Sequence, residues 1–132
     1  MNVMLDTNIC IYLIKHVPPA LIERFRAFPV GDIGISVMTL AELEYGASKS
    51  TQPRRNLEAL EQFIVPLEVA MFDRQAAVAY GRIRAALEKK GRPIEAMDLL
   101  IAAQALSLGV RLVTNNEREF RRVPGLRVEN WT

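Results

Sequence analysis

The sequence contains very few of the residues that form disulfides or zinc sites. It has one cysteine, Cys10, and one histidine, His16, among 132 residues. A single cysteine excludes a disulfide within the chain, which fits a reducing compartment. A zinc site needs several Cys or His ligands, and two residues do not supply them. Cys10 also lies in an apolar run, where a buried thiol is the ordinary interpretation.

Long apolar runs are missing as well. No stretch approaches the roughly 20 apolar residues of a membrane-spanning helix. The opening residues "MNVMLD" lack the basic start and long apolar core of a signal peptide. We therefore expect no membrane association and a cytoplasmic location.

The overall charge carries little information about partners. The formal net charge is +2, although Arg outnumbers Lys thirteen to four. A planar guanidinium suits phosphate, but genomic base composition also enriches Arg, so both explanations stay open. Half of the residues are hydrophobic, which predicts a globular chain and not a disordered one. At this length we expect a single domain over residues 1–132.

Short apolar segments alternate with longer segments of helical periodicity. Strands are predicted over residues 2–6, 32–36, 66–73, 110–114 and 126–131, and helices over 20–28, 37–49, from Pro53, 74–90 and 94–109. Residues 8–15 have a strand-like composition, but Asp6 or Thr7 can cap a helix there. This alternation predicts an α/β fold, with a short central parallel sheet flanked by helices on both faces.

Polar residues follow several of the predicted strands. In parallel sheets the functional crevice lies beyond the carboxyl ends of the strands. The residues expected there are Asp6 after the first strand, Ser36 and Glu42 after the second, and Thr114, Asn116 and Glu119 after the fourth. Each of the residues after the fourth strand also fits a turn or a helix cap.

Two acidic residues lie in helices whose other residues suit burial. Asp98 lies in "EAMDLLIAAQAL", where the simpler explanation is a carboxylate near a helix N-terminus. Glu42 is followed by Gly46, which costs about 0.5–1 kcal/mol relative to Ala inside a helix. Space for something to approach Glu42 would explain that cost, whereas an exposed Glu would need no explanation. A rotation of this helix would exchange Glu42 with Glu44.

Together these acids predict a site for a cation. Two carboxylates about 5 Å apart repel by roughly 3 kcal/mol at an effective dielectric near 20. Three such pairs cost roughly 10 kcal/mol, comparable to the stability of a whole domain. Either some carboxyls stay protonated or a cation lies among them. Oxygen ligands alone favour Mg²⁺ or Mn²⁺ and, with them, metal-assisted hydrolysis of a phosphodiester.

Four motifs carry a resemblance to a known family: "MLDTNICIYLIK", "ISVMTLAELEYGASKS", "GRPIEAMDLLIAAQALSLG" and "LVTNNEREFRRVPGLRVENW". In this order they resemble the PIN-domain family, and specifically the VapC-type toxins of type II toxin–antitoxin pairs. The resemblance implies a PIN-like fold and an Mg²⁺- or Mn²⁺-dependent endoribonuclease. It assigns Asp6, Glu42 and Asp98 to the metal site.

The resemblance also assigns supporting roles. Thr7 and Asn8 complete the opening motif, with Asn8 orienting Asp6 or a metal-bound water, and Thr114 matches the hydroxyl residue that ends the last core strand. The fourth acidic position departs from the common pattern, because Asn116 is uncharged where many relatives carry Asp. We expect Glu119 to fill it, and whether one or two metals bind stays open.

The family further implies partners. These are a structured RNA such as tRNA, a small antitoxin that inserts into the acidic cleft, operator DNA bound only through that antitoxin, and a second copy of the chain in a homodimer. Exposed arginines are expected to contact RNA phosphates: Arg54, Arg55, Arg82, Arg84, Arg92, Arg118, Arg121 and Arg122.

Two other functions compete with the nuclease. A phosphatase with an aspartyl-phosphate intermediate also uses an Asp after the first strand, but it usually needs a second Asp where Asn8 stands. The other alternative is a catalytically inactive PIN module that binds RNA or protein. The intact acidic positions argue against the inactive module.

Overall fold

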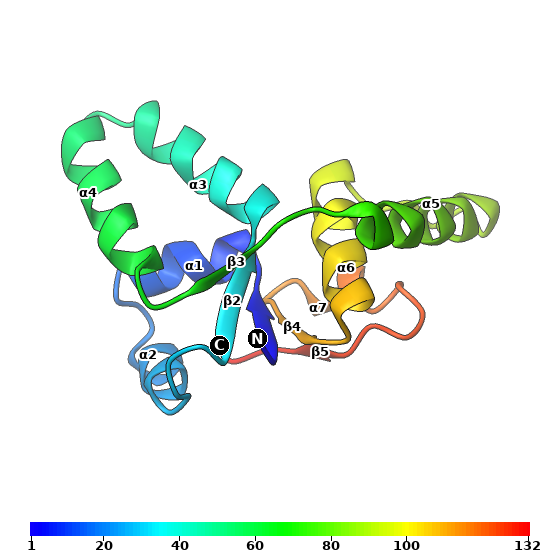
Figure 1. Cartoon of the computed structure of the whole chain (residues 1–132), viewed down its shortest axis with the longest axis horizontal. Coiled ribbons are helices and arrows are strands. Elements are labelled where there is room, and N and C mark those ends of the chain that lie inside the picture. The colour runs from blue at the N-terminus through cyan, green and yellow to red at the C-terminus, as the bar shows by residue number, and fades with distance from the viewer.

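A five-stranded parallel sheet forms the centre of the computed structural model, which describes residues 1–132 (Figure 1). The strands are β1 (Val3–Leu5), β2 (Ile33–Ser36), β3 (Glu68–Ala70), β4 (Arg111–Val113) and β5 (Val128–Glu129). Their spatial order is β3-β2-β1-β4-β5, and every neighbouring pair is parallel. The predicted short parallel sheet is confirmed, although β3 is shorter than the predicted strand over residues 66–73.

Helices cover both faces of this sheet, as predicted. The first group is α1 (Thr7–Ile14), α2 (Pro19–Arg26), α3 (Val37–Ser48) and α4 (Pro53–Ile64), and the second is α5 (Arg74–Lys89), α6 (Ala96–Leu108) and α7 (Glu117–Phe120). Each group packs its own apolar cluster against the strands. In Figure 1, α1 to α4 lie to the left of the sheet, and α5 and α6 lie to the right.

The central strand β1 is apolar because it is buried on both faces. Val3 and Leu5 pack into the cluster beneath the first helix group, and Met4 packs into the other. All three side chains are completely inaccessible to solvent. Parallel strands between two helical layers need such continuous apolar runs, so a carboxylate can enter only where β1 ends.

Helix caps at the ends of two strands determine where the next helices begin. The Asp6 carboxylate accepts a hydrogen bond from the Ile9 backbone N–H (2.9 Å), so residues 7–14 form a helix despite their strand-like composition. The Ser36 hydroxyl accepts one from the Met38 N–H (2.9 Å) and begins α3 in the same way. Both helices therefore start directly at the carboxyl edge of the sheet.

The strand order creates a crevice at β1. The chain moves outward from β1 to β2 and β3 on one side, and to β4 and β5 on the other. Open parallel sheets bind ligands where the order reverses in this way, beyond the carboxyl ends of the strands. Asp6 occupies this point.

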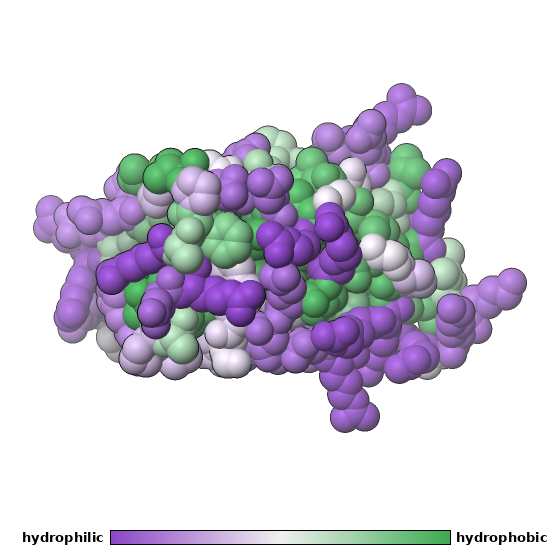
Figure 2. Space-filling view, turned by 90° about the horizontal axis from the view of Figure 1, so that it is seen from below, coloured by the Kyte–Doolittle hydropathy of each residue, from purple (hydrophilic) through white to green (hydrophobic).

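The surface mixes polar and apolar areas. Figure 2, seen from below the view of Figure 1, shows long hydrophilic side chains around the rim with apolar patches between them. None of the helices has both the length and the apolar character needed to span a bilayer.

Packing around β2 predicts that Gly34→Ala destabilises the fold. A Cβ at Gly34 would lie 2.5 Å from the Glu68 carbonyl oxygen and would also collide with the Met1 side chain. We expect the free energy of unfolding to fall by about 1–3 kcal/mol in urea denaturation. Gly81→Ala in α5 is the control, since its Cβ would meet nothing within 4 Å, and it should gain about 0.5–1 kcal/mol. Equal stability of the two variants would contradict this packing.

Candidate active site

Asp6 lies at the base of the crevice and is held rigidly. Its side chain is only 4% exposed, and its backbone N–H donates to the Val113 carbonyl of β4 (3.0 Å). Burial raises the pKa of Asp6, while hydrogen bonds from the Thr114 hydroxyl and the Ile9 N–H oppose that rise. The carboxylate therefore has a fixed position but no cationic partner.

Thr7 connects Asp6 to the second acidic position. Its hydroxyl donates to the Glu42 carboxylate (2.5 Å) and so ties α1 to α3. Glu42 is partly buried at this junction, whereas Glu44 is exposed. The rotation of α3 thus brings Glu42, and not Glu44, to the edge that carries Asp6.

Asp98 is the most perturbed acid of the site. It lies in the first turn of α6, where its backbone N–H donates to the Glu95 carboxylate (3.2 Å). Burial raises the pKa of Asp98 to about 7, with further contributions from the negative charges of Glu119, Glu95, Asp6 and Glu42. The charges of all the other predicted acids thus act on Asp98, which places them around one region.

Glu119 lies beside Asp98 and already uses both carboxylate oxygens. One oxygen accepts from the Glu95 backbone N–H (3.1 Å) and the other from the Asn116 side-chain amide (2.7 Å). The Asn116 N–H in turn donates to the Thr114 hydroxyl (2.9 Å). This chain of hydrogen bonds fastens α7 to the start of α6, so Glu119 positions the residues around Asp98.

Two features of the site were not predicted from the sequence. Glu95 contributes a further carboxylate beside Asp98, and the signal for it is an acidic residue three positions before Asp98, at the helix N-cap. Asn8 supports Asp6 through its backbone N–H and not through its side-chain amide, because Asn8 is exposed.

No basic side chain neutralises these acids. The ion pairs of the chain join Met1 with Glu68, Arg84 with Glu88, Arg111 with Glu129, and Arg121 with Glu117. No three carboxylates are close enough in the present arrangement to ligate a single ion. The Glu42 and Glu119 carboxylates are instead engaged by hydrogen bonds from the Thr7 hydroxyl and the Glu95 N–H.

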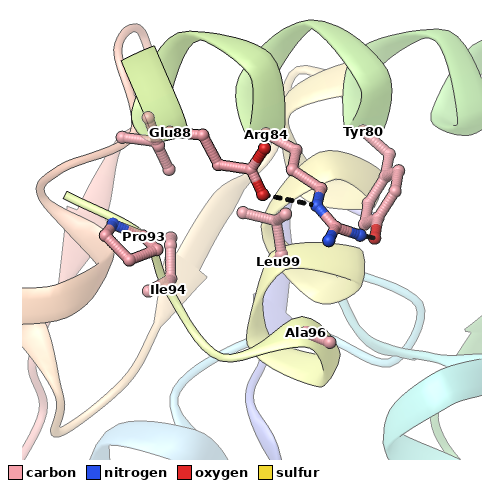
Figure 3. Close-up of a pocket in the computed structure, with 8 residues that line it drawn as sticks. Tyr80, Arg84, Glu88, Pro93, Ile94, Ala96 and Leu99 are labelled. Carbon is pink, nitrogen blue, oxygen red and sulfur yellow. Dashed lines mark hydrogen bonds and ion pairs between the residues drawn. The ribbon is translucent and has the colours of Figure 1, made fainter. Parts of the chain in front are cut away.

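Two hollows flank the sheet. A groove of about 290 Å³ between α1, α3 and α4 includes Glu42 and Gly46 in its wall. A separate pocket of about 270 Å³ lies between α5 and α6 (Figure 3). There Arg84 donates to the Glu88 carboxylate (3.0 Å) and to the Tyr80 hydroxyl (2.8 Å). Arg84 is thus occupied within the chain.

The predicted phosphate-binding arginines fall into separate groups. Arg54 and Arg55 lie at the start of α4, and Arg82 lies on α5. The Arg122 side chain donates to the Pro93 carbonyl (2.9 Å), which joins the loop of Arg92 to the segment after α7. Arg118 and Arg92 therefore lie on the Asp98 side of the molecule. Their contacts with RNA remain predictions.

Comparison with known proteins identifies the family. Residues 3–126 match the family described as PIN domain. The chain belongs to the PIN-domain family. It is 51% identical over 128 residues to a protein of Salmonella typhimurium named tRNA(fMet)-specific endonuclease VapC, which covers 97% of this chain and 96% of that relative.

Solved structures agree with this PIN assignment. A crystal structure of DNA-bound VapBC from Salmonella typhimurium has a TM-score of 0.95 at 49% identity, over 100% of this chain and 99% of the other. VapBC2 from Rickettsia felis, bound to a DNA fragment from its promoter, has a TM-score of 0.92 at 40% identity, over 100% of each chain. Within the PIN family, the chain is a member of the VapC ribonucleases.

The raised pKa of Asp98 predicts a pH-dependent stability in metal-free protein. Between its ordinary value of 3.8 and about 7, the folded chain keeps a proton that the unfolded chain has released. The neutral Asp98 carboxyl therefore contributes to the free energy of unfolding. This contribution is fully present below pH 3.8 and is lost as the pH rises through about 7. In EDTA, we expect Asp98→Asn to raise the melting temperature at pH 8 by about 2–6 °C. The melting temperature of the wild type should fall between pH 5 and 8, and that of Asp98→Asn should fall less.

Glu44→Gln is the control, because it neutralises an exposed carboxylate in the same way, and it should leave this pH profile unchanged. Parallel profiles of wild type and Asp98→Asn would show that Asp98 does not hold the proton.

Proposed function

We propose that this ribonuclease depends on Mg²⁺ or Mn²⁺ and acts as a toxin by cutting initiator tRNA. The observation that carries the proposal is the set of carboxylates without countercharge around the end of β1, where burial and neighbouring negative charges raise the pKa of Asp98 to about 7. The choice of tRNA rests on the relative named tRNA(fMet)-specific endonuclease.

The residues of the site fit a hard divalent cation. All the available donors are carboxylate, hydroxyl and amide oxygens, which Mg²⁺ and Mn²⁺ prefer. Asp6, Glu42 and Asp98 would hold the ion once their carboxylates move closer together than they lie in the metal-free arrangement. The ion would then replace the proton that burial and repulsion favour on Asp98. When bound, such an ion lowers the pKa of a water molecule and offsets the charge of the scissile phosphate.

The surrounding residues set the geometry for this chemistry. The Ile9 N–H and the Thr114 hydroxyl fix Asp6, and the Thr7 hydroxyl fixes Glu42. Glu119 positions the first turn of α6 and with it Asp98. Glu119 becomes a fourth ligand only if its bonds to Glu95 and Asn116 open, and a second ion depends on that step.

The partners follow from the same charge pattern. We propose that a small antitoxin inserts a cationic segment among the acids, because Asp6, Glu42, Asp98 and Glu119 form no ion pair with a Lys or Arg of the chain. Related VapBC complexes have been solved with DNA, so operator DNA would be bound through the antitoxin. Homodimerisation and action in the cytoplasm complete the proposal.

The two alternative functions fit the structure less well. An aspartyl-phosphate phosphatase needs an accessible nucleophile, whereas Asp6 is 4% exposed and caps α1. An inactive binding module would have no need to keep Asp98 beside four other acids at a cost in stability.

Cleavage of initiator tRNA by purified variants tests the proposal. Glu42→Gln and Asp98→Asn should each lose cleavage by about 100-fold or more, because each removes a metal ligand. Glu44→Gln is the matched control on α3 and should cleave like wild type. EDTA should abolish cleavage, and Mg²⁺ or Mn²⁺ should restore it, with product ends mapped by sequencing.

Two results would defeat this function. One is Mg²⁺-dependent cleavage by Asp98→Asn at the wild-type rate. The other is a folded wild-type protein that cleaves no RNA in either metal.

A further inference from the structure

The outer surface of α3 carries an aromatic side chain that the proposed mechanism does not use. Tyr45 is 66% exposed, although Tyr usually buries its ring and exposes only its hydroxyl. The Lys49 ammonium lies 4.7 Å from the centre of the Tyr45 ring, within cation–π range. The ring is thus associated with a positive charge while most of it stays open to solvent.

Helix geometry places this ring next to the acidic site. At 100° per residue, Tyr45 lies about 60° around α3 from Glu42, and Lys49 lies about 20° from it. At 1.5 Å per residue, Tyr45 is about 4.5 Å and Lys49 about 10.5 Å further along the axis. Glu42, Tyr45 and Lys49 therefore follow one another along one side of α3. Figure 1 shows that α3 runs from the sheet to the turn that joins it to α4.

Gly46 leaves space beside these residues. A Cβ at Gly46 would meet nothing within 4 Å, so the chain's own packing does not require glycine there. Yet glycine inside a helix costs about 0.5–1 kcal/mol relative to Ala. Gly46 also lines the groove that includes Glu42. The missing side chain at Gly46 therefore leaves room beside Glu42 for a group that approaches from outside.

The tip of the α3–α4 hairpin carries two exposed cations, Lys49 and Arg54. The Ser50 hydroxyl donates to the Ala47 carbonyl (2.6 Å), and the Asn56 amide donates to Ser50 (2.8 Å). These bonds hold the turn between Lys49 and the exposed Arg54. An aromatic ring followed by exposed cations matches the alternating bases and phosphates of a single strand, since bases stack on aromatic rings and phosphates pair with Lys or Arg.

We propose that Tyr45 stacks on an unpaired nucleobase beside the scissile phosphate, and that Lys49 and Arg54 bind the phosphates beyond it. This proposal rests on the ribonuclease function above and adds the path of the RNA strand on one side of the site. It makes Tyr45 a substrate-positioning residue, with its effect in binding and not in the chemical step.

Steady-state cleavage of initiator tRNA tests this role. Tyr45→Ala should raise KM by about 5- to 150-fold, the range expected for one lost base stack, with little change in kcat. Tyr45→Phe should keep the wild-type KM because the ring remains. Tyr80→Ala is the control, since it removes a tyrosine ring from the separate α5–α6 pocket, and it should leave KM unchanged.

A binding readout independent of activity uses Tyr45→Trp combined with Asp98→Asn, which prevents cleavage. Addition of initiator tRNA should quench the new tryptophan fluorescence, because a stacked base lies against the indole. The native Trp131 is buried, so the Asp98→Asn protein without Tyr45→Trp gives the background signal. Unfolding curves confirm that each variant folds.

The outcomes separate this proposal from the function on which it rests. Wild-type cleavage with equal KM values for Tyr45→Ala and Tyr80→Ala would overturn only the stacking role. A Tyr45→Ala protein that cleaves normally but binds its antitoxin more weakly would assign the ring to protein docking and also overturn the proposal. A wild-type protein that cuts no RNA would overturn both.

Discussion

The burial of carboxylates that lack a countercharge, together with their repulsion of one another, is the constraint on which the rest of this structure depends. A buried sheet normally excludes such groups, and Asp6, the one buried carboxylate, lies just beyond the carboxyl end of β1. The chain tolerates Asp6 through hydrogen bonds and Asp98 through a retained proton. Under the function proposed above, a divalent cation would replace both solutions.

The fold supplies this arrangement through a few short-range rules. An apolar β1 must end before the first charge, and the residue that ends it caps the next helix. The reversal of strand order at β1 then opens the crevice over Asp6. Helices α3 and α6 start near the same edge, which carries Glu42 and Asp98 to it. The positions of the proposed site residues therefore follow from where the helices begin and from the order of the strands.

Much of this could be predicted from the sequence because it depends on local patterns. Apolar segments, caps and the positions of Asp6 and Asp98 are visible along the chain. Local patterns did not separate Glu42 from Glu44, and only the family resemblance selected Glu42, because the choice depends on the rotation of α3 and the bond from Thr7. Local patterns also do not reveal the bond between the Glu95 N–H and the Glu119 carboxylate, since it joins residues that are 24 positions apart in the chain.

The most direct measurement is a titration of the Asp98 carboxyl by ¹³C NMR, with and without Mg²⁺. We predict a midpoint near the value of about 7 in metal-free protein, and a fall below about 5 when Mg²⁺ binds, because the cation replaces the proton. A metal-free midpoint near the ordinary 3.8 that Mg²⁺ does not move would show that the acids neither repel one another nor share a cation.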